Sequence, residues 1–267
     1  IHRAVASGLI SSGENVIDLS TLAIPVVRHW ARRHRLPAVH IQSSPVDPRS
    51  LDIRIFDNTG LDLDKGSERK LENLYFREDI RRVSHYEMGH LQQRHEDLES
   101  YVAELVSKLD VETVRRSRPK VVVDYSSGAA TQVLPRVLQE MNCTVIPLNA
   151  SPEEIVSEQD EKAFRARLEE IGVITQAVGA HLGVFIDSPG ERVFLIDQEG
   201  RVLQHDVAFA VLAQLALVGK PGLLLGPASA SLAFSKIAEQ LNSRFVPTKS
   251  TPGSVLRSAQ HTETVLA

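Results

Sequence analysis

The chain has 267 residues and a formal net charge of −4, from 30 Lys and Arg against 34 Asp and Glu. This balance leaves no basic stripe, so we expect no nucleic-acid partner. Hydrophobic residues make up 42% and charged residues 24%, which is typical of a globular chain with a real core.

The ends of the chain and its single cysteine indicate where it works. No apolar run approaches the roughly 20 residues that span a bilayer, and the first residues do not have the pattern of a signal peptide. Cys143 has no second cysteine to pair with. We therefore expect a cytoplasmic protein without a membrane partner. Because it begins at Ile1 rather than Met and stops inside an apparent element at Ala267, we interpret it as an excerpt cut at both ends.

Short β-rich runs alternate with helix-period stretches from the start of the chain. Pro25 suits the first turn of a helix, where its missing N–H costs nothing. Arg28 opens a basic run to Arg35 that we interpret as the wet face of this helix, and less readily as an anion surface. The polar stretch 78–95 is predicted to be a linker. The predicted elements to this point are helix 4–10, strand 16–19, helix 25–34, strand 38–41, strand 51–56 and helix 65–77.

The next part of the chain predicts a parallel sheet. The strand 120–125 is apolar at consecutive positions, which suits burial on both faces under helices. The elements expected around it are helices 97–109, 129–141 and 161–177 and strands 144–147, 181–186 and 193–196. A third series follows, with helices 208–217 and 231–241 and strands 222–225 and 244–246. The pattern predicts an α/β fold of three modules, over 1–90, 91–198 and 199–267, the first and last incomplete.

Several stretches, taken in order, carry a resemblance to a known family. They are Gly60–Asp64, Phe76–Asp79, Lys120–Tyr125 with Gly128, Val133–Pro135, Gly179–Gly183 and Gly200–Leu203. This ordered set resembles the α-D-phosphohexomutases, the phosphomannomutase and phosphoglucomutase group. The resemblance implies successive α/β/α domains with mixed, mostly parallel sheets, a hexose phosphate substrate and, if active, an intramolecular phosphotransferase.

Two loops look nearer to a subgroup in which a mutase-like region is fused behind a sugar nucleotidyltransferase of the mannose-1-phosphate guanylyltransferase type. They are 44–49 and 187–192. This second resemblance implies a fused or partner nucleotidyltransferase domain and a sugar nucleotide as an alternative ligand. A homo-oligomer is also compatible with it.

The resemblance places the phosphate-carrying serine of the family at Ser44. The family loop reads Thr-Ala-Ser-His-Asn-Pro, whereas this chain has Pro45 and Val46 after the serine. Pro45 has no N–H and a fixed φ, so the loop cannot offer the same backbone donors. Ser44 is therefore either the nucleophile or a surface hydroxyl in a proline-rich turn, and we favour the second.

The resemblance also places a Mg²⁺ loop at 187–192. The family supplies three carboxylates from Asp-x-Asp-x-Asp-Arg, but here only Asp187 and Glu191 are acidic, and Pro189 takes the central position. Mg²⁺ prefers oxygen ligands in near-octahedral geometry, so a lost carboxylate weakens the site. We predict instead an ion-paired turn in which Arg192 contacts Asp187 or Glu191, and Mg²⁺ remains the alternative.

The remaining candidates are weaker. Arg192 and Lys249 match substrate-binding positions of the family, although the residues after Lys249 depart from its pattern. The segment Ser126–Gly128 precedes a helix, so its N–H groups could hold an anion, but we expect a serine there to cap the helix. The sequence thus supports three functions: a mutase-like module without turnover, which we favour, a divergent mutase using Ser44 and Mg²⁺, and a plain interaction domain.

Overall fold

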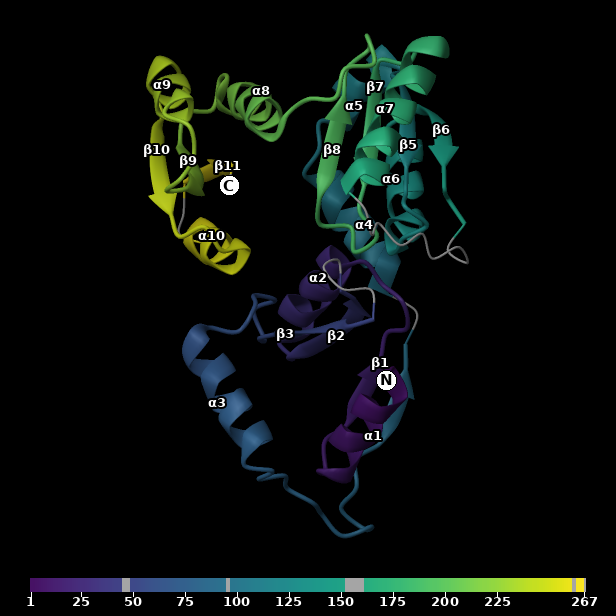
Figure 1. Ribbon diagram of the computed structural model, residues 1–267, viewed down its shortest axis with the longest axis vertical. Helices are drawn as coiled ribbons and strands as arrows, with labels where there is room; N and C mark the ends of the chain where they lie inside the picture. The colour runs from purple at the N-terminus through teal and green to yellow at the C-terminus, as the bar shows by residue number, and fades with distance from the viewer. Residues whose placement is uncertain (45–48, 95–96, 152–160, 261–262, 267) are drawn as a thin grey trace.

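The computed structural model describes residues 1–44, 49–94, 97–151, 161–260 and 263–266. Figure 1 shows three groups of elements in chain order, which we call units I, II and III. Unit I contains α1 (His2–Ser11), β1 (Val16–Asp18), α2 (Ile24–His34), β2 (Ala38–Ser43), β3 (Leu51–Phe56), α3 (Lys65–Phe76) and β4 (Leu91–Gln93).

Unit I holds two small sheets. β2 and β3 form an antiparallel hairpin, and β1 pairs in parallel with β4. The predicted linker 78–95 is therefore wrong in part, because Leu91–Gln93 is a strand that extends unit I past residue 90. Two of its three residues are glutamines and all three are exposed, so neither hydrophobicity nor alternation indicated a strand.

Unit II is built on a four-stranded sheet in the order β6-β5-β7-β8, in which only β8 runs antiparallel to its neighbour. β5 is buried along nearly its whole length, as its consecutive valines predicted. The elements of unit II are α4 (Asp97–Ser107), α5 (Val111–Ser117), β5 (Lys120–Asp124), η1 (Ala129–Gln132), α6 (Leu134–Glu140), β6 (Thr144–Leu148), α7 (Glu161–Ala177), β7 (Leu182–Ile186) and β8 (Val193–Ile196).

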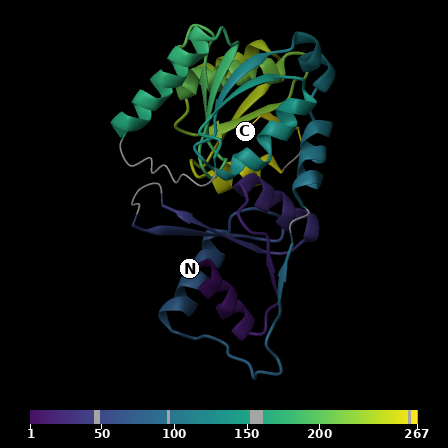
Figure 2. The same cartoon turned by 90° about the vertical axis from the view of Figure 1, so that its right-hand side faces the viewer.

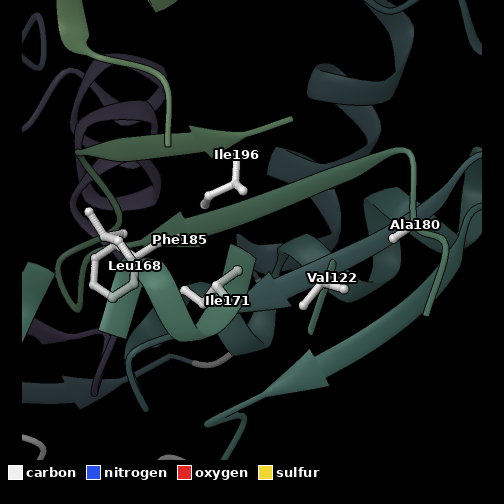
Figure 3. Close-up of a cluster of buried hydrophobic side chains, with 6 residues drawn as sticks. All are labelled: Val122, Leu168, Ile171, Ala180, Phe185 and Ile196. Atoms are coloured by element: carbon white, nitrogen blue, oxygen red, sulfur yellow. The ribbon is translucent and has the colours of Figure 1, made fainter. Parts of the chain in front are cut away.

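One of the buried clusters of unit II lies between α7 and the sheet. Figure 3 shows Val122, Leu168, Ile171, Phe185 and Ile196 in this cluster, together with Ala180, and all are buried. Phe185 is fully buried and meets two further phenylalanine rings edge to face. Full burial of each large apolar side chain contributes about 1.5–3 kcal/mol, so this cluster anchors the sheet to α7.

A buried carboxylate organises the end of β5. Both oxygens of Asp124 accept hydrogen bonds from the Arg167 guanidinium, at 2.6 and 2.9 Å, and the Ser126 N–H donates to Oδ1. The N–H groups of Ser127 and Gly128 donate to Asn149 and Tyr125 carbonyls. The anion site considered at 126–128 therefore has its N–H groups engaged within the protein.

The predicted capping serine is also wrong. The helix that follows is capped by Gly128, with no side-chain cap. The predicted helix 129–141 is divided into the short 3₁₀ helix η1 and α6. Pro135 explains the break, because it lacks an N–H and therefore suits the first turn of a new helix.

Unit III contains a parallel sheet in the order β10-β9-β11, with helices beside it (Figure 1). Its elements are α8 (His205–Leu217), β9 (Leu223–Pro227), α9 (Ala233–Gln240), β10 (Arg244–Thr248), α10 (Pro252–Ala259) and β11 (Thr264–Leu266). The fold class, α/β with mixed and mostly parallel sheets, is thus as predicted. In the described residues, no helix has the length and apolar character needed to cross a membrane.

Units I and II meet along α2. Val26 of α2 and its N-cap residue Ala23 pack in one buried cluster with Val133 and Val137 of unit II. Figure 2 shows α2 between the hairpin of unit I and the units beyond it. The loops at this junction contain most of the residues that the sequence singled out.

Candidate functional site

Polar side chains line one face of the β2–β3 hairpin. His40 on β2 lies directly opposite Arg54 on β3, and Gln42 lies opposite Asp52. Alternation along β2 continues this face to Ser44, whose N–H donates to the Ser50 carbonyl at 3.0 Å. The predicted serine therefore lies at the loop end of the hairpin, one residue past β2. The prediction that this loop is altered rests on Pro45 and Val46, which lie outside the described residues.

The loop 187–192 is a tight turn between β7 and β8, organised by Asp187. The Asp187 carboxylate is buried, with 3% of the residue exposed. Its Oδ1 accepts the N–H groups of Glu191 and Arg192 at 2.8 and 2.9 Å, and its Oδ2 accepts Arg192 Nε at 2.9 Å. The predicted ion pair between Arg192 and Asp187 is confirmed. The pair lies within the turn and uses Oδ2, while the two backbone N–H groups occupy Oδ1.

The Glu191 side chain extends from unit II across the junction to two arginines of unit I. Its carboxylate forms an ion pair with Arg54 and lies 3.4 Å from Arg28 Nη2. The same two guanidiniums bind the carboxylate of Asp62, at 2.8 Å from Arg54 and 2.7 Å from Arg28. We call these four residues, Arg28, Arg54, Asp62 and Glu191, the arginine pair cluster.

The arginine pair cluster is partly shielded from water, and the pKa values of Asp62 and of the neighbouring His40 are lowered. Burial alone would raise the pKa of Asp62, but hydrogen bonds from Arg28 and Arg54 outweigh it, so the pKa is lowered. Burial lowers the pKa of His40, and the Arg54 charge lowers it further despite the opposing effects of Glu191 and the Leu22 carbonyl. His40 is thus held neutral beside a charged cluster.

The same loop docks on α2 through its backbone. The Ile24 N–H at the start of α2 donates to the Pro189 carbonyl at 2.9 Å. A Cβ added at Gly190 would lie 3.1 Å from the Ala23 side chain. Gly128 is closer still, because a Cβ there would lie 2.5 Å from the Ser188 backbone. The loop is therefore a packed contact between units, and two glycines permit its close approach.

The donor set does not fit a Mg²⁺ site as the structure arranges it. Mg²⁺ requires several oxygen ligands that converge. Asp187 turns both oxygens into its own loop, Glu191 turns both toward arginines of unit I, and the position between them is Pro189. Across the residues that the structure describes, no group of three His, Cys, Asp or Glu side chains could hold a metal ion.

The two predicted substrate-binding residues lie apart from each other in the fold. Arg192 is in the unit II turn, where its side chain is 59% exposed beyond the Nε contact. Lys249 follows β10 in unit III and is exposed. Asp187 and Glu191 belong to the junction of units I and II, Ser44 lies at the loop end of the unit I hairpin, and Lys249 belongs to unit III.

Sequence reasoning missed Arg28, Arg54, Asp62 and His40. Arg28 was assigned with its neighbours to a wet helix face, but its side chain is only 14% exposed. Alternation in 51–56 did place Arg54 on one face with Asp52. The missing information was the partner: Arg54 is 137 residues from Glu191 in sequence. Asp62 was noted only for the family resemblance of its loop.

Comparisons with known proteins agree with this architecture. Residues 1–82 match the family described as phosphoglucomutase/phosphomannomutase, alpha/beta/alpha domain I, and residues 99–200 match alpha/beta/alpha domain II of the same family. A phosphoglucomutase/phosphomannomutase of Thermococcus kodakarensis is 33% identical over 253 residues, covering 93% of this chain and 55% of that protein. A phosphoglucosamine mutase of Gloeothece citriformis is 27% identical, covering 93% of this chain and 52% of that protein.

Solved structures share the fold. A phosphoglucomutase/phosphomannomutase family protein of Burkholderia thailandensis superposes with a TM-score of 0.82 at 17% identity, over 98% of this chain and 58% of that one. The phosphoglucomutase parafusin of Paramecium gives a TM-score of 0.71 at 13% identity, over 93% of this chain and 53% of that one. The chain spans about half the length of the curated relatives that it matches.

Proposed function

Because this chain belongs to the phosphoglucomutase/phosphomannomutase family through its domains I and II, we propose that it is a phosphohexomutase-type module that recognises hexose phosphates without transferring phosphate. In this proposal the loop that would hold Mg²⁺ has become an ion-paired contact between units I and II. The chain keeps the fold of the phosphohexomutases but has lost the phosphoryl-transfer step.

The ion pairing of loop 187–192 is the single observation that carries this proposal. Phosphoryl transfer needs a cation that neutralises charge on the moving group, together with an exposed nucleophile. Here both surviving acids of the loop are engaged by guanidinium or backbone N–H groups. Recruiting a metal would therefore require breaking the Asp187–Arg192 pair and the Glu191–Arg54 pair together.

The partner part of the proposal rests on sequence resemblance alone. The loops 44–49 and 187–192 resemble those of mutase-like regions fused to a sugar nucleotidyltransferase. We propose that the module serves such a domain in the cytoplasm, as an assembly or sugar-phosphate-sensing part, with homo-oligomers compatible with this role. Co-purification with a sugar nucleotidyltransferase would support this part of the proposal, and its absence from the purified protein would contradict it.

An active mutase is the second candidate, and the relatives favour it. The Thermococcus kodakarensis protein, 33% identical, is named as a mutase. In this alternative Ser44 carries the phosphate, Asp187 and Glu191 bind Mg²⁺, and Arg192 and Lys249 contact the sugar phosphate. Ser44 is half-buried at the loop end of the hairpin, in a loop as the family nucleophile is.

One assay separates the two candidates. The full-length protein is incubated with Mg²⁺ and mannose 1-phosphate or glucose 1-phosphate, and formation of the 6-phosphate is followed. The proposal predicts no turnover above the buffer blank, for the protein and its Ser44→Ala variant alike. Turnover that Ser44→Ala abolishes would establish the active mutase instead.

A further inference from the structure

Two guanidinium groups converge at the junction of units I and II. Arg28 from α2 and Arg54 from β3 both lie over the ring of Phe56, at 4.4 and 5.4 Å from its centroid. Their side chains are 14% and 23% exposed, so water screens them only in part. Planar guanidinium forks, held in this way, match the oxygens of a carboxylate or a phosphate.

One of the two acids in the arginine pair cluster is a permanent partner. Asp62 belongs to unit I, and Arg28 Nη1 also donates to the neighbouring Gly60 carbonyl at 3.0 Å. The Asp62 carbonyl in turn accepts Arg257 Nη2 of unit III at 2.8 Å. Asp62 is therefore fixed through its backbone and its side chain, and it balances one of the two positive charges.

The other acid is held differently. Glu191 reaches the pair from unit II, at the end of a turn, and its side chain is 30% exposed. Its distance to Arg28 is 3.4 Å, longer than any of the Asp62 contacts, so its hold on the pair depends on the close ion pair with Arg54 alone. The turn itself is organised by Asp187 and does not depend on Glu191. A competing anion could thus replace the Glu191 carboxylate while the turn stays intact.

We propose that Arg28 and Arg54 form a binding site for a phosphate monoester, and that Glu191 occupies this site as an internal anion. Two phosphoryl oxygens would take the places of Glu191 Oε1 and Oε2, and Asp62 would keep its present contacts. This deepens the proposed function, because it names where the hexose phosphate of that proposal is recognised. Binding would also release Glu191 and so loosen the contact between units I and II.

The test is calorimetric titration of the full-length protein at constant ionic strength, first with inorganic phosphate and then with glucose 6-phosphate. Removing the internal competitor with Glu191→Gln should tighten phosphate binding about fivefold, as expected for displacing an ion pair of this exposure. Arg54→Gln should weaken binding at least tenfold. If that variant does not fold, Arg54→Lys keeps the charge, loses the fork and should weaken binding less.

The matched control is Glu199→Gln. Glu199 pairs with Arg201 in an exposed turn at the other end of β8, so this variant changes the net charge equally away from the site. It should leave the phosphate affinity unchanged. The inference is overturned if Glu199→Gln tightens binding as much as Glu191→Gln, if Arg54→Gln has no effect, or if neither the wild type nor Glu191→Gln binds phosphate. Phosphate binding without glucose 6-phosphate binding would leave this site standing and contradict the proposed ligand class.

Discussion

The carboxylate of Asp187 organises the turn between β7 and β8, and its replacement by alanine removes three hydrogen bonds at once. Two of them hold the backbone N–H groups of Glu191 and Arg192, and the third is the Arg192 ion pair. Leaving a buried donor without its acceptor costs about 1–3 kcal/mol, and the solvated end of Arg192 adds little. We therefore expect Asp187→Ala to lower the free energy of unfolding by about 2–4 kcal/mol.

Asp187→Asn is the graded comparison. Its amide oxygen can still accept the two backbone N–H groups, but its NH₂ group faces Arg192 Nε, which is also a donor. Only the ion pair is lost, so we expect a cost of about 1–2 kcal/mol. Urea unfolding is followed through Trp30, the one tryptophan of the chain, which is buried in α2.

Adding Mg²⁺ to the same titrations shows whether Asp187 only stabilises the turn or also binds a metal ion. A metal that binds the folded state stabilises it by about 2.7 kcal/mol when its concentration is 100 times Kd. We expect no such increase in the wild type and the same cost of Asp187→Ala with or without Mg²⁺. The reasoning is refuted if Mg²⁺ stabilises the wild type and the variant loses that increment, or if Asp187→Ala costs under about 0.5 kcal/mol.

Three further predictions follow from the packing and the pKa values. Phe185→Ala should lower the free energy of unfolding by about 3–5 kcal/mol in urea titrations, since the ring is fully buried. Asp124→Ala should lower the free energy of unfolding by about 3–5 kcal/mol in the same assay, because the mostly buried Arg167 guanidinium loses its carboxylate partner. A cost below about 1 kcal/mol would contradict this. His40 has a lowered pKa when folded, so the unfolded chain takes up its proton first as pH falls. Stability should therefore decline below about pH 6.5, and His40→Gln should flatten that decline in thermal unfolding between pH 7 and 5, whereas identical slopes would count against it.

The buried strands of the sheets could be predicted because their signal is local. The valines at 121–123 lie on consecutive positions, and only a strand covered on both faces needs that pattern. The helix beginning at Pro25 was likewise predictable from its first turn. By contrast, β4 is one leucine and two glutamines, all exposed, whose pairing partner is β1, more than 70 residues earlier. Pairing at that distance leaves no trace in composition.

The candidate site divides in the same way. The Asp187–Arg192 ion pair was predictable, because both residues belong to one turn of six residues. The ion pairs of Glu191 with Arg54 and Arg28 were not predictable. A helical period indicates that Arg28 shares a face with Arg32, but not that Arg28 turns inward to Asp62 while Arg32 stays exposed. Only the docking of unit II on α2 brings Glu191 to these arginines.

The most direct test of the inactive-module account is mass spectrometry of Ser44. The full-length protein is incubated with Mg²⁺ and a hexose phosphate, digested, and the peptide containing Ser44 is weighed. The account predicts an unmodified peptide, because both acids of loop 187–192 are engaged by N–H and guanidinium groups and are not available as metal ligands. A phosphate on Ser44 that disappears in Asp187→Ala would contradict it.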